Sequence, residues 1–128
     1  MPGILLHAPI TDQILGGCYS LYRALGYGFL ETVYKNGLVV ELGRRGLVVR
    51  REVPVEVFYL GVSIGFYRID LLVNEKVIVE VKAQHSLTVV DEKQLSNYLK
   101  ATNLEVGLLF NFGPEPKFER IVYSNDRK

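Results

Sequence analysis

The sequence predicts an α/β (α+β) sandwich, in which helices pack against a β-sheet. Three observations support this class: two helical patterns near the start, a central region rich in Val, Ile, Phe and Tyr, and a third helical pattern followed by a short apolar run. The length of 128 residues and the apolar content of 48% fit one domain, residues 1–128, with a substantial core.

Two helices are expected before the strands. The first runs from Pro9 to near Gly26, because a proline suits a first helical turn and apolar residues recur at helical spacing. The second runs over residues 29–45, with Gly46 as its terminator and with Glu31 and Tyr34 in its first turn. The apolar stripe of the first helix consists of Ile10, Ile14, Cys18, Leu21 and Leu25.

Residues 47–82 are predicted to form three or four antiparallel strands, with turns at Leu60-Gly61 and at 74–76. Pro54 indicates a bulge or an edge strand. A third helix is expected at 88–102. A strand at 106–112 is expected to be buried on both faces, and a last strand covers 118–123.

Asp70, Glu80 and Lys82 fall on one predicted hairpin. Residues two apart on a strand share a face, so Glu80 and Lys82 point the same way, and this face is expected to turn outward to solvent. If residues 74–76 form the loop, Asp70 lies opposite Glu80, with Cβ atoms about 4.5 to 5.5 Å apart. Two carboxylates at that separation repel unless a cation compensates or one takes up a proton. A divalent metal is the natural compensation.

Two alternatives stay open for this hairpin. A two-residue turn at Asn74 and Glu75 would shift the pairing by one residue and move Asp70 to the face opposite Glu80. The charges also fit an ordinary hydrated face, on which Asp70 pairs with Lys82 or Arg68.

Charge and cysteine content restrict the function classes. The net charge of +1 leaves no overall basic excess, so nucleic-acid binding requires a local patch; the candidates are Arg44, Arg45, Arg50 and Arg51. The single Cys18 excludes an internal disulfide and a four-cysteine metal site within one chain, and a cytoplasmic setting is expected. No signal peptide or membrane-spanning run is expected, so a membrane is not a predicted partner.

A resemblance to a known family rests on the run GFLETVY at 28–34 together with Asp70 and the run EVK at 80–82. These residues resemble the GxxExxY family of the PD-(D/E)XK nuclease superfamily. Further similar stretches are REVPVEV at 51–57, YRID at 67–70, YLKAT at 98–102 and VGLLFNFG at 106–113. The resemblance covers most of the chain and implies a restriction-endonuclease-like core, a mixed central sheet flanked by helices. Ile69 stands where the superfamily pattern has a proline, a departure that removes no ligand.

The resemblance implies a role for each site residue. Glu31, Asp70 and Glu80 would hold Mg²⁺ or Mn²⁺, and Lys82 would position or activate water. The backbone oxygen of Val81 is a further candidate ligand, since hard divalent ions prefer oxygen. Glu31 alone also fits a simple interaction with the helix dipole.

Three further side chains are candidate supporting residues. Tyr34 either packs or hydrogen-bonds beside the site, or belongs to the core. Gln94 and Tyr98, spaced i and i+4 on one helical face, resemble the QxxxY feature of recombination-type nucleases. In that reading Gln94 contacts DNA or water, and Tyr98 orders the lysine or stacks near substrate. The alternative is an amphipathic helix on which both are boundary residues.

The leading hypothesis is a metal-dependent nuclease that hydrolyses DNA phosphodiester bonds. The main alternative is a non-catalytic nucleic-acid-binding or assembly module on the same scaffold, and a third is hydrolysis of another phosphate ester. A domain this small offers limited surface for gripping a duplex, which favours a homodimer formed through a sheet edge or the first helix.

Overall fold

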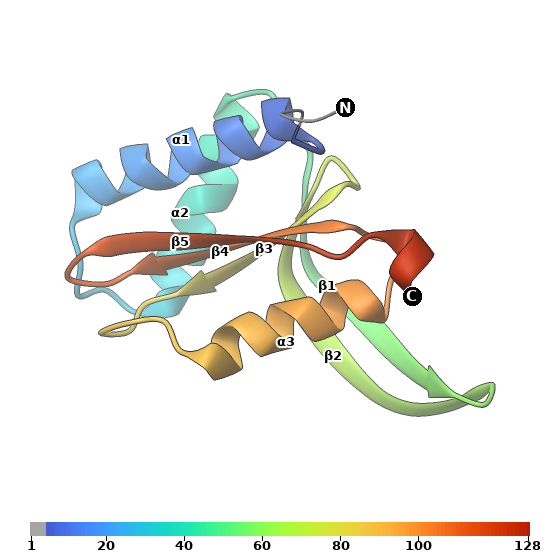
Figure 1. Cartoon of the computed structure of the whole chain (residues 1–128). Helices are drawn as coiled ribbons and strands as arrows, with labels where there is room; N and C mark the ends of the chain where they lie inside the picture. The colour runs from blue at the N-terminus through green and yellow to red at the C-terminus, as the bar shows by residue number, and fades with distance from the viewer. Residues whose placement is uncertain (1–4) are drawn as a thin grey trace.

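A five-stranded sheet forms the middle layer of the molecule, with α1 and α2 on one face and α3 on the other (Figure 1). The computed structural model describes residues 5–128. The strands follow one another across the sheet in chain order: β1 (Val49–Tyr59), β2 (Val62–Val73), β3 (Val77–Lys82), β4 (Val106–Phe112) and β5 (Pro116–Val122). All pairs are antiparallel except β3 and β4, which are parallel and connected through α3 (Val89–Lys100). This mixed sheet with flanking helices confirms the predicted α+β class.

The helix α1 (Ala8–Leu25) buries its predicted apolar stripe against the sheet, and α2 (Glu31–Arg44) buries Tyr34, Leu38 and Leu42 there. The apolar residues Leu30 and Val33 at the start of α2 are exposed. Ile14 and Cys18 of α1 are fully buried. Gly28, in the connection between the two helices, has a φ of 109°, a conformation that only glycine adopts without strain. The chain therefore turns sharply into the start of α2, where Glu31 lies.

The register of β2 and β3 follows from a three-residue loop at 74–76. Val73 pairs with Val77 and Leu71 pairs with Val79, so the pairing is symmetric about Glu75 as predicted. The alternative shift by one residue is wrong. Asn74 and Glu75 both adopt left-handed φ angles, of 52° and 55°, which turn the chain back on itself.

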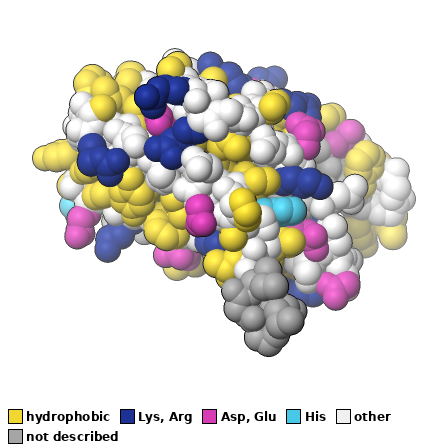
Figure 2. All heavy atoms as spheres, turned by 90° about the horizontal axis from the view of Figure 1, so that it is seen from above, with side chains coloured by type: hydrophobic (Ala, Val, Ile, Leu, Met, Phe, Trp, Pro, Cys, Tyr) yellow, Lys and Arg dark blue, Asp and Glu magenta, His cyan; other side chains and the backbone are white. Residues whose placement is uncertain are grey.

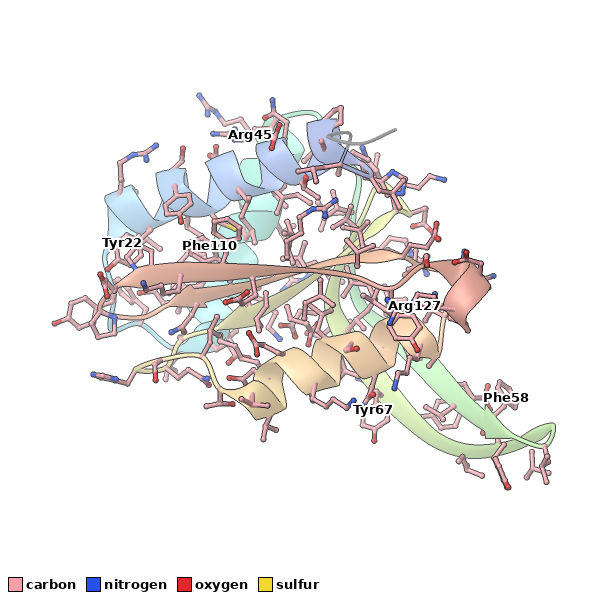
Figure 3. All side chains as sticks on the ribbon, viewed as in Figure 1. Tyr22, Arg45, Phe58, Tyr67, Phe110 and Arg127 are labelled. Atoms are coloured by element: carbon pink, nitrogen blue, oxygen red, sulfur yellow. The ribbon has the colours of Figure 1, made fainter. Side chains whose placement is uncertain are left out.

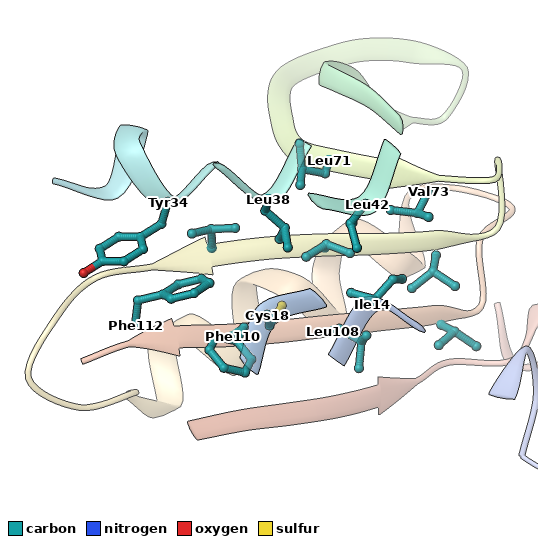
Figure 4. Close-up of a cluster of buried hydrophobic side chains, with 14 residues drawn as sticks. Ile14, Cys18, Tyr34, Leu38, Leu42, Leu71, Val73, Leu108, Phe110 and Phe112 are labelled. Atoms are coloured by element: carbon teal, nitrogen blue, oxygen red, sulfur yellow. The ribbon is translucent and has the colours of Figure 1, made fainter. Parts of the chain in front are cut away.

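The apolar core lies on both faces of the sheet. On the α1 and α2 side, Leu38, Phe110 and Phe112 are among the side chains that fill the space between helices and strands (Figure 4). On the α3 side, Ile78 and Leu95 belong to a second cluster. All seven residues of β4 are buried, which confirms the prediction of burial on both faces.

The predicted outward face of the hairpin is not a hydrated face. Glu80 shares the face of β3 that carries Ile78, and α3 packs against this face, so Glu80 is only 4% exposed. The expectation of an open, solvent-facing strand is wrong because the third helix crosses back over it.

Beyond the sheet, β1 and β2 continue as a projecting two-stranded arm, defined here as residues 55–67 (Figure 1). Its tip is the predicted turn at Leu60-Gly61. β1 lies at the edge of the sheet, in agreement with Pro54, while the bulge falls between Val57 and Phe58.

The outer face of α1 carries charged and apolar side chains intermixed, without a continuous basic band (Figure 2). Within residues 5–128, no helix combines the length and the apolar character needed to cross a membrane. The expectation about a signal peptide concerns in part residues 1–4, which lie outside the described residues.

Candidate active site

The candidate site lies where β2 and β3 separate. Their backbone pairing ends at Leu71 and Val79, and beyond that point two side chains continue the connection. The Asp70 N–H donates to Oε2 of Glu80 at 2.7 Å, and the Val81 N–H donates to Oδ2 of Asp70 at 2.8 Å. Each carboxylate is thus fixed by backbone of the neighbouring strand, and the prediction that Asp70 lies opposite Glu80 is confirmed.

An irregularity in β2 lies beside Asp70. Ile69 and Leu71 are two residues apart, yet Ile69 packs in the α3-side cluster and Leu71 in the cluster under α1 and α2. The strand therefore rotates at Asp70. Glu52, which lies between the β1 partners of these two residues, has a left-handed φ of 51°.

Burial and like charge act together on Glu80. Desolvation raises the pKa of Glu80 to about 8, and the neighbouring charge of Asp70 adds to the shift. The site therefore holds two facing carboxylates whose simultaneous ionisation is unfavourable without a cation.

One cation already lies at this site, and it is a residue that the sequence prediction did not include. Nζ of Lys35, on α2, is 3.2 Å from Oδ1 of Asp70 and 3.0 Å from Oε1 of Glu52. Lys35 thus compensates part of the negative charge. Its spacing of four residues from Glu31 gives a signal, because such a pair shares a helix face.

Glu31 and Lys82 lie near the pair without contacting it directly. Partial burial raises the pKa of Glu31; Lys82 opposes the shift and Asp70 adds to it. This mutual influence places Glu31 at the first turn of α2 within electrostatic range of Lys82 and Asp70. The fold therefore brings Glu31, at the start of α2, to the same end of the sheet as Asp70 on β2 and Lys82 on β3.

Tyr34 lies inside the core. Its ring stacks on Phe112 with centroids 4.4 Å apart, and its hydroxyl donates to the Gly26 carbonyl at 2.6 Å. The Phe29 N–H in turn donates to the Tyr34 hydroxyl at 3.4 Å. Tyr34 therefore packs in the core, one of the roles considered for it. Its hydroxyl anchors the loop that leads to Glu31.

Gln94 and Tyr98 share a face of α3, as their spacing predicts, and line one cavity. Tyr98 is 5% exposed and belongs to the α3-side cluster. Burial raises the pKa of Tyr98 to about 12, with further contributions from the charges of Glu80 and Asp70. Tyr98 thus lines the cavity and packs in the same buried cluster as Ile69 and Ile78, which are close in sequence to Asp70 and Glu80.

Asn111 fixes the chain just after Lys82, and sequence reasoning missed it. It is fully buried on β4, opposite Lys82. Its side-chain oxygen accepts from the Gln84 N–H at 3.0 Å and its amide donates to the Gln84 carbonyl at 2.9 Å. A polar residue in the otherwise apolar run 106–112 is the signal for this role.

The arginines considered as a basic patch are largely engaged by acidic side chains. Arg45 is 2.8 Å and Arg44 is 3.8 Å from carboxylate oxygens of Glu41. Arg50 is 2.8 Å from Glu75. These pairs lower the positive charge that the cluster offers to a nucleic acid.

A comparison with models of protein families shows which family this chain belongs to. The family model of the PD-(D/E)XK nuclease superfamily matches residues 8–121, most of the chain. The chain belongs to the PD-(D/E)XK nuclease superfamily. Its fold is consistent with the restriction-endonuclease-like core of this superfamily, and nuclease activity on nucleic acid is what the superfamily indicates. The finer GxxExxY affiliation remains a resemblance.

Solved structures with a similar overall fold also exist. One that is similar is described as "Crystal structure of SSO0001", with a TM-score of 0.58 and 21% sequence identity. The alignment covers 91% of this chain and 59% of that chain, so the chain spans somewhat over half of the relative's length. No curated protein matches the sequence.

PD-(D/E)XK nucleases typically use divalent ions. The carboxylates of this site provide part of the oxygen ligands that such an ion requires. Within residues 5–128, no group of three or more His, Cys, Asp or Glu side chains stands together as a metal cluster. Asp70 and Glu80 form a facing pair, and Glu31 is not grouped with them. Mg²⁺ nevertheless binds commonly through one or two carboxylates, and the raised pKa of Glu80 shows that a cation would relieve the pair.

Proposed function

We propose that the protein is a divalent-metal-dependent nuclease that hydrolyses DNA phosphodiester bonds beside Asp70 and Glu80. The observation that carries the proposal is the exchange of hydrogen bonds between these carboxylates and the backbone where β2 and β3 separate. Carboxylates held this way are preorganised oxygen donors at the end of a rigid sheet.

Each residue has a proposed task. Asp70 and Glu80 hold Mg²⁺ or Mn²⁺, with Glu31 and the Val81 carbonyl as additional oxygen donors. When bound, the ion supplies Lewis acidity and neutralises phosphate charge. Lys82 follows Glu80 by two residues on β3, orients the attacking water and stabilises the negative charge that develops on the phosphate.

Lys35 has a proposed task as well. Because its ammonium group already contacts Asp70, it holds the carboxylate in place in the metal-free protein and competes with an incoming cation. Tyr34 and Asn111 support the site from the core, through the loop before α2 and the loop after β3.

The test is a calorimetric Mg²⁺ titration of wild type, Asp70→Asn and Lys35→Met, with cleavage of labelled single- and double-stranded DNA assayed on the same preparations. Asp70→Asn keeps an acceptor for the Val81 N–H but loses the charge, so we expect Mg²⁺ binding to weaken at least tenfold and cleavage to be lost. Lys35→Met removes a competing cation at 3.2 Å, so we expect Mg²⁺ to bind several-fold more tightly.

The opposite responses of these variants are the internal control, since both remove one charge from the same site. If wild type binds no Mg²⁺ and cleaves neither DNA, the nuclease proposal is wrong. The second candidate, a non-catalytic nucleic-acid-binding module, would then be favoured.

We also propose that the protein acts as a homodimer through its projecting arm, and that it works in a reducing, cytoplasmic setting. The buried Cys18 is a free thiol, which fits reducing conditions.

A further inference from the structure

A cavity of about 690 Å³ lies between α3 and the arm. This volume falls within the usual range for pockets that bind small molecules. Its lining comes from both sides: Phe58 and Tyr67 from the arm, and Gln94, Asn97 and Tyr98 from α3. Figure 3 shows Tyr67 at the α3 end of the arm and Phe58 further toward its tip.

Aromatic side chains form one part of this cavity. The rings of Tyr67 and Tyr98 are 5.5 Å apart at 52°, so Tyr98 supports Tyr67 from behind. Tyr67 is 51% exposed and Phe58 is 60% exposed, and each offers aromatic surface to a ligand. Exposed aromatic rings of this kind are platforms on which unstacked nucleobases pack.

Polar side chains form the other part. Gln94 and Asn97 contribute amides, which both donate and accept hydrogen bonds and so match the edge of a nucleobase. Lys93 and Lys100 supply two cations against the single carboxylate of Glu56. The excess of positive charge suits a phosphate group.

The cavity lies near the carboxylate pair. Tyr67, which lines it, precedes Asp70 by three residues on β2, and Tyr98 packs in the same buried cluster as Ile69, next to Asp70, and Ile78, two residues before Glu80. A nucleotide bound here would therefore lie beside the proposed cleavage position.

We propose that this cavity receives one unpaired nucleobase of the substrate, stacked on Tyr67, so that the preferred substrate carries a single-stranded segment next to the cleaved bond. The assignment rests on the proposed nuclease function for its catalytic meaning. A base inside an intact duplex is stacked and paired on both sides and cannot enter such a cavity unless it is extruded.

The test is binding in the presence of EDTA, where cleavage is absent. Fluorescence anisotropy would compare a labelled oligothymidylate strand with a blunt duplex of equal length. We expect the full-length protein to bind the single strand about tenfold more tightly. Tyr67→Ala should weaken single-strand binding about tenfold, the effect of losing one stacked base. Tyr67→Phe keeps the aromatic ring and should bind the single strand as wild type does.

Tyr59→Ala is the matched control, because Tyr59 is an exposed arm tyrosine that does not line the cavity. It should change the affinity less than twofold, and circular dichroism would verify that all variants are folded. Equal affinity for both nucleic acids, or an unchanged affinity in Tyr67→Ala, would overturn the inference. Self-association of the protein that buries Tyr67, with no nucleic acid bound there, would also overturn the inference.

The binding and cleavage measurements distinguish failure of the nuclease proposal from failure of the cavity assignment. Single-strand binding that depends on Tyr67 without Mg²⁺-dependent cleavage would retain the cavity assignment and reject the nuclease. Mg²⁺-dependent cleavage with equal efficiency in Tyr67→Ala and wild type would retain the nuclease and reject the cavity assignment.

Discussion

At the scale of single residues, the site holds a carboxylate in an unfavourable environment. Glu80 is 4% exposed, and burial together with the charge of Asp70 raises its pKa to about 8 from an ordinary value of 4.5. Between these two pH values the folded metal-free protein keeps a proton on Glu80 that the unfolded chain releases. The folded state therefore binds more protons, and its free energy of unfolding falls as pH rises through this window.

The corresponding prediction concerns the Glu80→Gln variant. Glutamine keeps an acceptor for the Asp70 N–H but carries no charge, so the variant should lose most of the decline in stability between about pH 5 and pH 8. At pH 8 we expect it to be more stable than wild type by roughly 1 to 3 kcal/mol. Glu31, whose pKa burial also raises, leaves a residual slope of the same sign.

Urea unfolding of the metal-free protein at several pH values would measure this difference. Glu119→Gln, a change at an exposed position on β5, is the control and should follow wild type. A wild-type stability that stays constant or rises from pH 5 to pH 8 would contradict the assignment of Glu80 as a destabilised carboxylate.

At the scale of elements, α3 packs closely on the sheet because β4 has a glycine beneath it. A Cβ at Gly107 would lie 2.6 Å from Cδ1 and 2.9 Å from Cγ of Leu95, which is itself fully buried. The position of α3 matters for the proposed function, since this helix carries Gln94 and Tyr98 and closes over Glu80.

We therefore expect Gly107→Ala to destabilise the protein by about 1 to 3 kcal/mol, because the Leu95 side chain must move within a packed core. Gly65→Ala is the matched control, since a Cβ at this β2 glycine meets nothing within 4 Å. Chemical denaturation measures both. Adding Leu95→Ala to Gly107→Ala should give a smaller loss than the sum of the two single changes; simple additivity would contradict the proposed contact.

The elements also show what the sequence can and cannot predict. Loop chemistry at 74–76 and strand alternation are local, so they are sufficient to predict that Asp70 faces Glu80. The burial of Glu80 depends on the path of the crossover through α3, which alternation does not contain. The contact of Lys35 with Asp70 likewise needs the tertiary position of α2, and the rotation that puts Ile69 and Leu71 in different clusters breaks the period of two in β2 before Asp70.

At the scale of the whole molecule, the arm is the least protected part of the surface. Residues 57–67 read VFYLGVSIGFY and contain no charge. Six of their side chains are at least 60% exposed: Phe58, Tyr59, Leu60, Val62, Ile64 and Phe66. Because neighbouring residues of a strand point to opposite faces, these side chains make both faces of the arm mostly apolar. A stable protein interface needs about 800 Å² from each partner.

In the proposed homodimer a second copy of the chain would pack arm against arm, since an isologous contact presents the same apolar patch from both partners. Phosphates have little to bind here, because residues 57–67 carry no cation. Phe58 belongs both to this patch and to the cavity lining, whereas Ile64 and Phe66 do not line the cavity, so changes at these two residues test the dimer without altering the proposed base pocket.

We expect wild type to sediment as a dimer at micromolar concentrations and Ile64→Lys or Phe66→Lys to sediment as a monomer, because a lysine at the centre of an apolar contact would be buried without a partner. Val40→Lys, a change at an exposed apolar residue of α2 outside the arm, should leave the dimer intact. A wild type that stays monomeric in sedimentation velocity as its concentration is raised would reject the dimer. It would leave the apolar arm free for a different protein.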